Sequence, residues 1–250
     1  MALSTIGSGV RGGVAFLTRL PVDAGADDWE RFSSFPAAFP IVAYLVGALV
    51  ALPFVVPTIG PTTTAFGYLL ALVVVVGIPH LDGVADLGDA MAAHGETRTK
   101  ALKDTDVGVG AVVAVVVVVS GIVLAAIAVA EIPPLAAVGI VIAAEVSAKL
   151  GMATVACLGT ASHEGMGSAF TSGTDPKLLV GPGLVALPAA IVVTPFPFGI
   201  GVVAAGPLVA VMLVRWADRE LGGVNGDVFG AANELGRVLA LHAGVIAWTL

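Results

Sequence analysis

The sequence is dominated by long apolar stretches that short polar segments separate. Most of these stretches approach the ~20 residues that a helix needs to cross a bilayer. They lie at residues 36–56, 64–80, 107–130, 134–157, 178–195, 198–215 and 236–250. The fifth and the last are short, so the pattern leaves six or seven transmembrane helices open. We therefore expect an all-α, polytopic membrane bundle that forms one domain over residues 1–250.

The N-terminal segment differs from these stretches because its apolar side chains occupy one helical face. They recur at helical spacing, at Leu3, Ile6, Val10, Val14 and Leu17. This spacing predicts an amphipathic helix over residues 3–18 that lies on the membrane surface. A peripheral helix that packs against the bundle explains the pattern equally well. Arg11 interrupts the apolar run, which argues against a signal peptide.

Composition excludes several classes of protein. Charged residues make up only 12% of the chain, whereas an ordinary soluble domain has ~25%. The high hydrophobic fraction of 58% excludes disorder, and the unbroken valine runs do not alternate as in an outer-membrane barrel. The formal net charge of −7 and the lack of a basic patch disfavour nucleic acid as a partner. The single cysteine, Cys157, excludes an internal disulfide.

Charge alternates from one connecting segment to the next. Most charged residues lie in 1–35, 81–106, 158–177 and 215–235, whereas the opposite turns contain only Glu131. With the first segment inside, all cations lie on or near one side: Arg11, Arg19, Arg31, Arg98, Lys100, Lys103, Lys149, Lys177, Arg215, Arg219 and Arg237. The positive-inside rule makes that side cytoplasmic in a cell-membrane protein. We expect any active site on this face, acting on a cytosolic substrate.

The densest group of chemical side chains follows the second apolar stretch, in HLDGVADLGDAM at residues 80–91. Asp82, Asp86 and Asp89 are spaced i, i+4 and i+7, which places them on one helix face. No Lys or Arg occurs between residues 32 and 97 to neutralise them. A divalent cation such as Mg²⁺ is the simplest counter-charge. The alternative is a solvated helix end, and His80 is either a site residue or an interfacial histidine.

A second charged group follows in ETRTKALKDTDVGVGA, residues 96–111. Asp104 precedes the third apolar stretch, where we expect it to join the acidic group as a metal ligand. Arg98 and Lys103 lie upstream, and basic side chains beside a carboxylate-bound metal suit a substrate with several phosphates. Positive-inside anchoring explains the basic residues equally simply.

Three further segments of the sequence each allow a functional and a purely structural interpretation. The glycine-rich segment at 222–237 would aim backbone N–H groups at phosphate or bring Asp227 to the metal, unless Asp227 merely caps a helix. Glu164 lies in a small-residue segment that is either a substrate-binding loop or a connector. Glu145 and Lys149, four residues apart, form either a neutralising pair or a substrate contact.

Taken together, these motifs resemble the cobalamin synthase family, the adenosylcobinamide-GDP ribazoletransferases. The resemblance rests on HLDGVADLGDAM, KDTDVGVGA and GGVNGDVFGAANEL, with VAFLTRLPV and HEGMGSAF in support. Some positions depart from the family pattern: Ala90, Asp106, Lys149 and Asn225, which stands where Thr is usual. We nevertheless count Asn225, with Asp227 and Glu164, among the expected substrate-binding residues.

The resemblance implies a membrane-embedded, Mg²⁺-dependent enzyme. Such an enzyme joins adenosylcobinamide-GDP to α-ribazole, or to its 5′-phosphate, and releases GMP. By this resemblance Asp82, Asp86, Asp89 and Asp104 are its acidic site residues, and Asp227 is the acid of its last motif. A ribose hydroxyl would attack the phosphorus on the cobinamide side, and a cluster aspartate or His80 would accept its proton. A homo-oligomer and the number of metal ions stay open.

Two other functions compete with this one. A CDP-alcohol phosphotransferase that makes lipid uses a similar acidic helix, but its distal spaced acids are missing here. A transporter with Glu145 and Lys149 in its pathway would predict internal repeats, and none is visible. Metal-dependent release of GMP from a nucleotide-activated corrinoid would separate the three.

Overall fold

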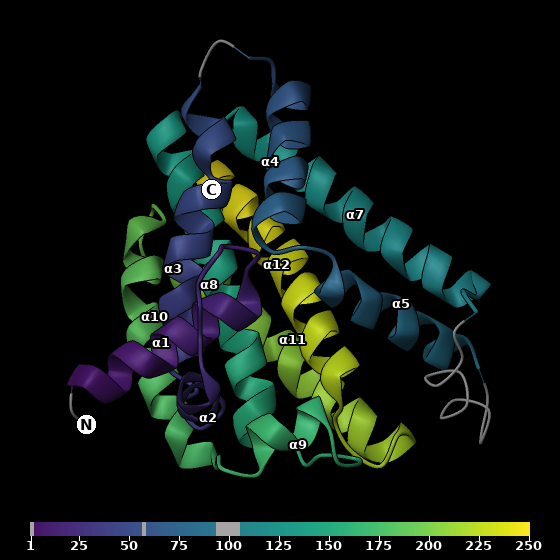
Figure 1. Cartoon of the computed structure of the whole chain (residues 1–250). Coiled ribbons are helices and arrows are strands. Elements are labelled where there is room, and N and C mark those ends of the chain that lie inside the picture. The colour runs from purple at the N-terminus through teal and green to yellow at the C-terminus, as the bar shows by residue number, and fades with distance from the viewer. Residues whose placement is uncertain (1–2, 57–58, 94–105) are drawn as a thin grey trace.

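The computed structural model describes residues 3–56, 59–93 and 106–250, and within them the chain is helical (Figure 1). The helices are α1 Leu3–Leu17, α2 Ala26–Ser33, α3 Ala38–Val50, η1 Leu52–Val55, α4 Pro61–Val75, α5 Pro79–Ala92, α7 Val109–Ala130, α8 Pro134–Leu158, α9 Met166–Thr171, η2 Pro176–Leu179, α10 Val180–Val192, α11 Phe198–Glu220 and α12 Gly226–Thr249. In these ranges the only β-structure is a single bridge between Ala161 and Val224. The expected all-α class is confirmed.

Helix α8 forms the centre of the bundle. It packs against α3, α10, α11 and α12. Of its most apolar 18-residue stretch, 72% is buried inside the protein. Small residues allow the close approach, because a Cβ at Gly206 would lie 1.9 Å from the carbonyl oxygen of Ser147. In turn, Ser147 Oγ accepts a hydrogen bond from the Gly206 N–H at 2.8 Å. Such small-residue crossings are typical of membrane helices.

The described helices supply fewer candidate spans than the sequence predicts. Three described helices, α7, α8 and α11, are long and apolar enough to cross a membrane, and the number reaches five if each bent helix pair counts as one span. Helix α10 has only 13 residues. Helix α12 begins at Gly226, ten residues before the predicted stretch, and is not among the candidate spans. The predicted six or seven spans are therefore not confirmed.

A sharp bend between α4 and α5 positions the acidic helix. The two helix axes differ by 97° across a short break. Gly77 adopts φ +85° in this break, a conformation that L side chains rarely adopt, and Pro79 begins the next helix. The Arg19 N–H, which follows α1, donates to Val75 O at 2.7 Å and holds the end of α4. The acids thus lie on a helix of their own, beyond the bend.

The predicted N-terminal helix exists as α1, and it packs against α2 and α3. Arg11 donates to Asp28 through Nε and Nη2, at 2.9 and 2.8 Å, which ties α1 to α2. Phe16 and Leu17 at its end line a cavity. The helix therefore packs on the bundle, and its position on a membrane surface stays a prediction.

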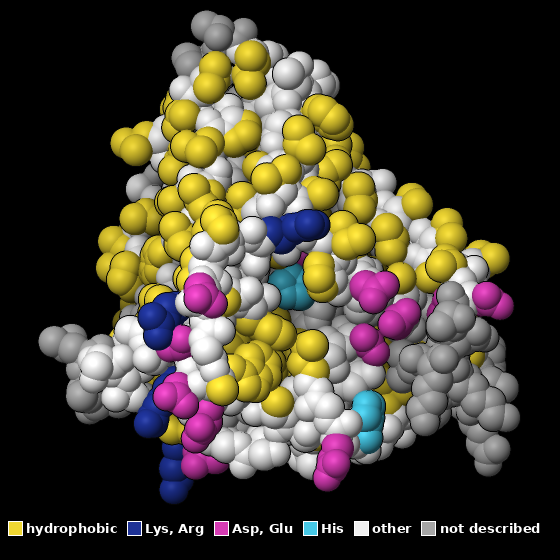
Figure 2. Space-filling model, in the orientation of Figure 1, with side chains coloured by type: hydrophobic (Ala, Val, Ile, Leu, Met, Phe, Trp, Pro, Cys, Tyr) yellow, Lys and Arg dark blue, Asp and Glu magenta, His cyan; other side chains and the backbone are white. Residues whose placement is uncertain are grey.

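Charge is unevenly distributed over the face shown in Figure 2. Hydrophobic side chains cover the upper part, and charged side chains gather across the lower part. Two of the cations are not on the surface. Lys149 and Arg237 are buried among the helices, with 0% and 1% of their surface exposed. Acids inside the bundle neutralise them, and the expectation that they lie on or near the charged side stays a prediction.

Candidate active site

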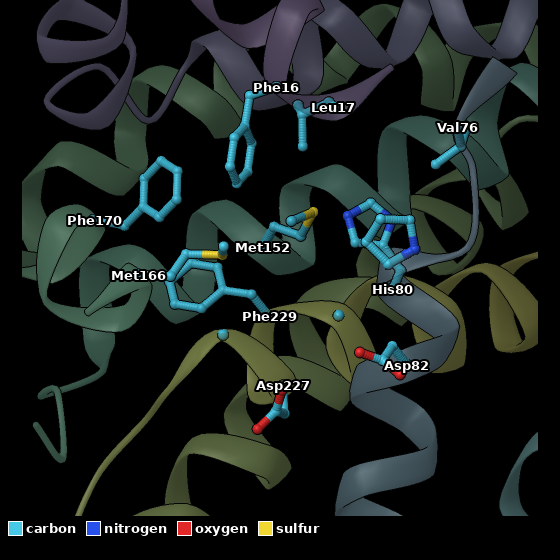
Figure 3. A pocket seen from close by; sticks show the side chains of 13 residues that line it. Phe16, Leu17, Val76, His80, Asp82, Met152, Met166, Phe170, Asp227 and Phe229 are labelled. Atoms are coloured by element: carbon cyan, nitrogen blue, oxygen red, sulfur yellow. The ribbon is translucent and has the colours of Figure 1, made fainter. Parts of the chain in front are cut away.

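The best-formed concave site is a cavity of about 350 Å³ where α1, α5, α8, α9 and α12 meet. In Figure 3 aromatic and methionine side chains occupy one side, and His80 and Asp82 occupy the other. Asp227 lies at the edge between them. A cavity of this size with few converging polar groups is typical of a small-molecule site.

The crossing of α5 and α12 brings two sequence motifs together. A Cβ at Gly83 would lie 2.8 Å from the carbonyl oxygen of Asp227, and a Cβ at Gly230 would lie 3.0 Å from that of His80. Neither position has room for a side chain. The glycines of both motifs thus allow backbone contact, which places Asp82 and Asp227 on one wall of the cavity.

Asp227 is held by its neighbour in the glycine-rich turn. Asn225 Nδ2 donates to Asp227 Oδ2 at 2.7 Å, and Asn225 Oδ1 accepts from the Val228 N–H at 3.2 Å. Asn225 is therefore the cap of α12, and the alternative that Asp227 is the cap is wrong. Burial raises the pKa of Asp227, and the negative charge of Asp82 raises it further. The two negative charges repel each other, and a cation bound between them would relieve that repulsion.

The other two acids of α5 occupy different environments. Asp86 is partly buried and lies within electrostatic range of Asp82, Asp89 and Asp227. Asp89 accepts hydrogen bonds from the backbone N–H groups of Gly108 at 2.8 Å and Ala111 at 2.9 Å. It therefore satisfies the start of α7, as an N-cap side chain does. Its predicted role as a metal ligand stays untested beside this structural one.

The described acids do not make a complete set of metal ligands by themselves. Among residues 3–56, 59–93 and 106–250, no three His, Cys, Asp or Glu side chains lie close enough to hold a metal ion by themselves. Mg²⁺ usually takes one or two protein carboxylates and fills its other positions with water and substrate phosphates. Asp82 and Asp227 both line the cavity, and two carboxylates are the protein share that this mode of binding requires.

The opposite side of the cavity is apolar and was not anticipated. It is made by Phe16, Met152, Met166, Phe170 and Phe229. The ring of Phe170 packs 5.5 Å from those of Phe16 and Phe229, measured between centroids. Such a wall suits a flat apolar ring. In the sequence these aromatic and methionine residues are far apart, because four separate helices contribute them to the wall. No local motif therefore predicted it.

A buried polar network lies behind His80. Lys149 Nζ and Arg237 Nη2 each donate to Glu145 Oε2 at 3.1 Å, and Arg237 also pairs with Glu234. The two acids balance the two bases. The neutralising alternative for Glu145 and Lys149 is the one that this geometry supports, and the distant partners Glu234 and Arg237 complete it. His80 joins the network through Asn233, at 3.1 Å.

Comparison with known proteins identifies the family, which the geometry of the cavity alone does not. A family model described as cobalamin-5-phosphate synthase matches residues 9–245. The chain belongs to this family.

Curated relatives agree with the family assignment. A protein of Halorubrum lacusprofundi named adenosylcobinamide-GDP ribazoletransferase is 47% identical over 96% of this chain and 97% of its own length. A protein of the same name from Haloquadratum walsbyi is 40% identical over 97% and 99%. One from Halobacterium salinarum is 51% identical over 75% and 96%. No solved structure matches the chain.

Not every residue predicted for this cobalamin synthase family site is placed at the cavity by the described residues. Arg98, Lys103 and Asp104 lie outside the described residues, so their roles stay predictions. Glu164 is exposed and does not line the cavity. Its segment reaches the site through Met166 and Phe170 instead.

Proposed function

We propose that this protein is an adenosylcobinamide-GDP ribazoletransferase, which joins the activated corrinoid to α-ribazole or its 5′-phosphate and releases GMP. The observation that carries the proposal is the cavity at the α5–α12 crossing. In a chain of the cobalamin synthase family, it combines Asp82 and Asp227 with an aromatic wall. A phosphoryl-transfer enzyme that acts on an aromatic nucleoside needs carboxylates near the phosphates and an apolar surface for the aromatic ring.

The two sides of the cavity suit the two reacting parts. The flat benzimidazole of α-ribazole would pack against Phe170, Phe229 and Met152, which exclude water from it. Its ribose would then lie toward Asp82 and Asp227, where the diphosphate of the other substrate must approach. A corrin ring is much larger than the cavity, so the corrinoid would remain at the mouth, beside the partly exposed Phe16 and Met166.

Mg²⁺ is the cofactor that this arrangement favours. Asp82 and Asp227 would hold it, with Asp86 nearby and with Asp104 as a further ligand on sequence grounds. When bound, the ion would neutralise diphosphate oxygens and stabilise the negative charge of the leaving GMP. Arg98 and Lys103 are proposed to contact phosphate on the same sequence grounds.

The protein side chains would perform the proton transfer. The ribose hydroxyl oxygen forms a bond to the phosphorus on the cobinamide side, and the bond from that phosphorus to the GMP oxygen breaks. If Asp82 holds the ion without Asp227, Asp227 is proposed to accept the hydroxyl proton, because burial makes an unbound carboxylate at this position more basic than an exposed one. The proton then passes to water, and GMP leaves with the bonding electron pair.

We place the site at the cytoplasmic face of the cell membrane. The charged segments that surround the cavity are those that the positive-inside rule assigns to the cytoplasm. Both substrates are charged or strongly polar, so a cytosolic supply is consistent with this orientation.

The test uses membranes that contain the full chain. Adenosylcobinamide-GDP is supplied with α-ribazole or with α-ribazole 5′-phosphate, with Mg²⁺ or with EDTA, and GMP and cobalamin products are quantified. We expect equal amounts of GMP and the joined corrinoid, formed only with Mg²⁺, and the better acceptor identifies the natural one. GMP formation without joined corrinoid would contradict the transferase, and undiminished turnover in EDTA would contradict the metal.

A further inference from the structure

Asn233 lies directly behind the histidine of the site. It is fully buried on α12, and its Nδ2 lies 3.1 Å from His80 Nδ1 on α5. The same amide nitrogen donates to Glu234 Oε1 at 2.8 Å. An amide NH₂ group has two protons, so one serves each acceptor.

The orientation of this amide is determined by its neighbours. If the amide turned by 180°, Asn233 Oδ1 would face the carboxylate of Glu234, and two acceptors would meet without a proton between them. In the observed orientation Oδ1 is instead buried with no hydrogen-bond partner in the described chain. Leaving a buried acceptor unpaired is unfavourable, and the contacts of Nδ2 outweigh that loss.

Glu234 itself cannot turn away. It is 4% exposed and pairs with Arg237, which in turn donates to Glu145. Lys149 donates to the same Glu145. A buried charge with fixed partners loses several interactions if it rotates, so this network holds the Asn233 amide in one orientation.

One consequence concerns the proton on the imidazole. Because Nδ1 of His80 accepts the Asn233 proton, the ring proton must lie on Nε2. The Nδ1 edge faces the buried amide, and His80 lines the cavity, so the Nε2 edge faces the cavity. The ring therefore presents an N–H donor to the cavity that Asp82 also lines.

We infer that Asn233 is a positioning residue that makes His80 a hydrogen-bond donor to a phosphate oxygen of the substrate. The inference rests on the proposed function, and it replaces the expectation that His80 accepts the hydroxyl proton. An Nε2 that already carries a proton has no lone pair for a second one. As a donor, His80 would contribute to the diphosphate pocket a hydrogen bond that strengthens as negative charge develops.

The first test reads the tautomer directly. The full chain with ¹⁵N-labelled histidine is placed in lipid nanodiscs, and the His80 resonances are assigned by comparison with His80→Gln. We expect a protonated Nε2 and an unprotonated Nδ1 in the native protein, and loss of that preference in Asn233→Ala. A native His80 with its proton on Nδ1 overturns the inference.

The second test compares three replacements of His80 by GMP release per inserted protein. Gln places an amide N–H near the position of Nε2, whereas Asn is too short and Ala has no donor. We expect His80→Gln to stay within about tenfold of native turnover, and both others to fall about 100-fold, the usual effect of losing one such donor. Equal losses in His80→Gln and His80→Ala overturn the donor role.

Failures of the two proposals are distinguishable. If native membranes release no GMP, the proposed function fails whatever the tautomer is. If they do, and Gln does not substitute for His80, only the inference fails. Should Asn233→Ala not accumulate in the membrane, the native tautomer and the three His80 variants decide the matter by themselves.

Discussion

At the scale of single residues, identical acids perform different tasks because their neighbours differ. Asp82 lines the cavity, whereas Asp89, two helical turns later, accepts two backbone N–H groups at the start of α7. Spacing along the chain put both on one helix face but could not distinguish them. The difference arises from the start of α7, whose backbone N–H groups bond to Asp89.

Replacing Asp82 by Asn removes one negative charge at nearly constant volume. We expect GMP release to fall at least about 100-fold, while the protein still inserts, because charge stabilisation at the phosphate is lost. Activity per inserted protein measures this. Asp218→Asn, which changes an exposed acid on α11, is the matched control and should leave turnover unchanged. Near-native turnover in Asp82→Asn would contradict the role of that carboxylate.

Arg237 has a structural role that the sequence does not indicate, since it neutralises two buried acids. Replacing it with Met leaves Glu145 and Glu234 without their shared cation inside the bundle. Removing one partner of a buried ion pair costs about 3–5 kcal/mol, so we expect a clear drop in the unfolding temperature in detergent. Arg237→Lys, which keeps the charge, should lose less. An unchanged unfolding temperature for the Met variant would show that the network is not stabilising.

At the scale of helices, glycines decide which motifs meet. The cavity exists because α5 and α12 touch at Gly83 and Gly230. The sequence predicted the local parts, namely the acidic helix, the Glu145–Lys149 pair and the glycine-rich turn. It could not predict their partners: Arg237 is 92 residues from Glu145, and Asn233 is 153 residues from His80. Contacts at such separations are determined by the packing of whole helices.

Gly83→Val tests whether this crossing positions the acids. A Cβ at this site meets backbone atoms of Asp227 that cannot yield, so the helices must separate. Overpacking of this kind costs about 1–3 kcal/mol. Displacing reacting groups by about 1 Å can cost about 100-fold in rate, so we expect turnover per inserted protein to fall by up to that factor. Gly201→Val, with open space around its Cβ, is the control. Equal turnover in the two variants would contradict the model of the site.

At the scale of the whole molecule, the distribution of charge determines orientation. The apolar end of the bundle includes the start of α4, and the charged end includes α9 and the cavity (Figures 1 and 2). The sequence predicted this asymmetry because it depends only on which segments carry charge. Its six or seven spans are not confirmed, because hydropathy does not reveal where a short helix such as α10 ends or where α4 bends into α5.

Cysteine labelling tests the orientation directly. Thr62, at the start of α4, and Ser172, which follows α9, are both exposed, whereas the single native cysteine, Cys157, is buried. In intact cells we expect a membrane-impermeant maleimide to label Thr62→Cys at once and Ser172→Cys only after permeabilisation. The reason is that loops near Lys and Arg are retained in the cytoplasm. The reverse pattern would place the cavity outside, where cytosolic corrinoid and nucleoside could not reach it.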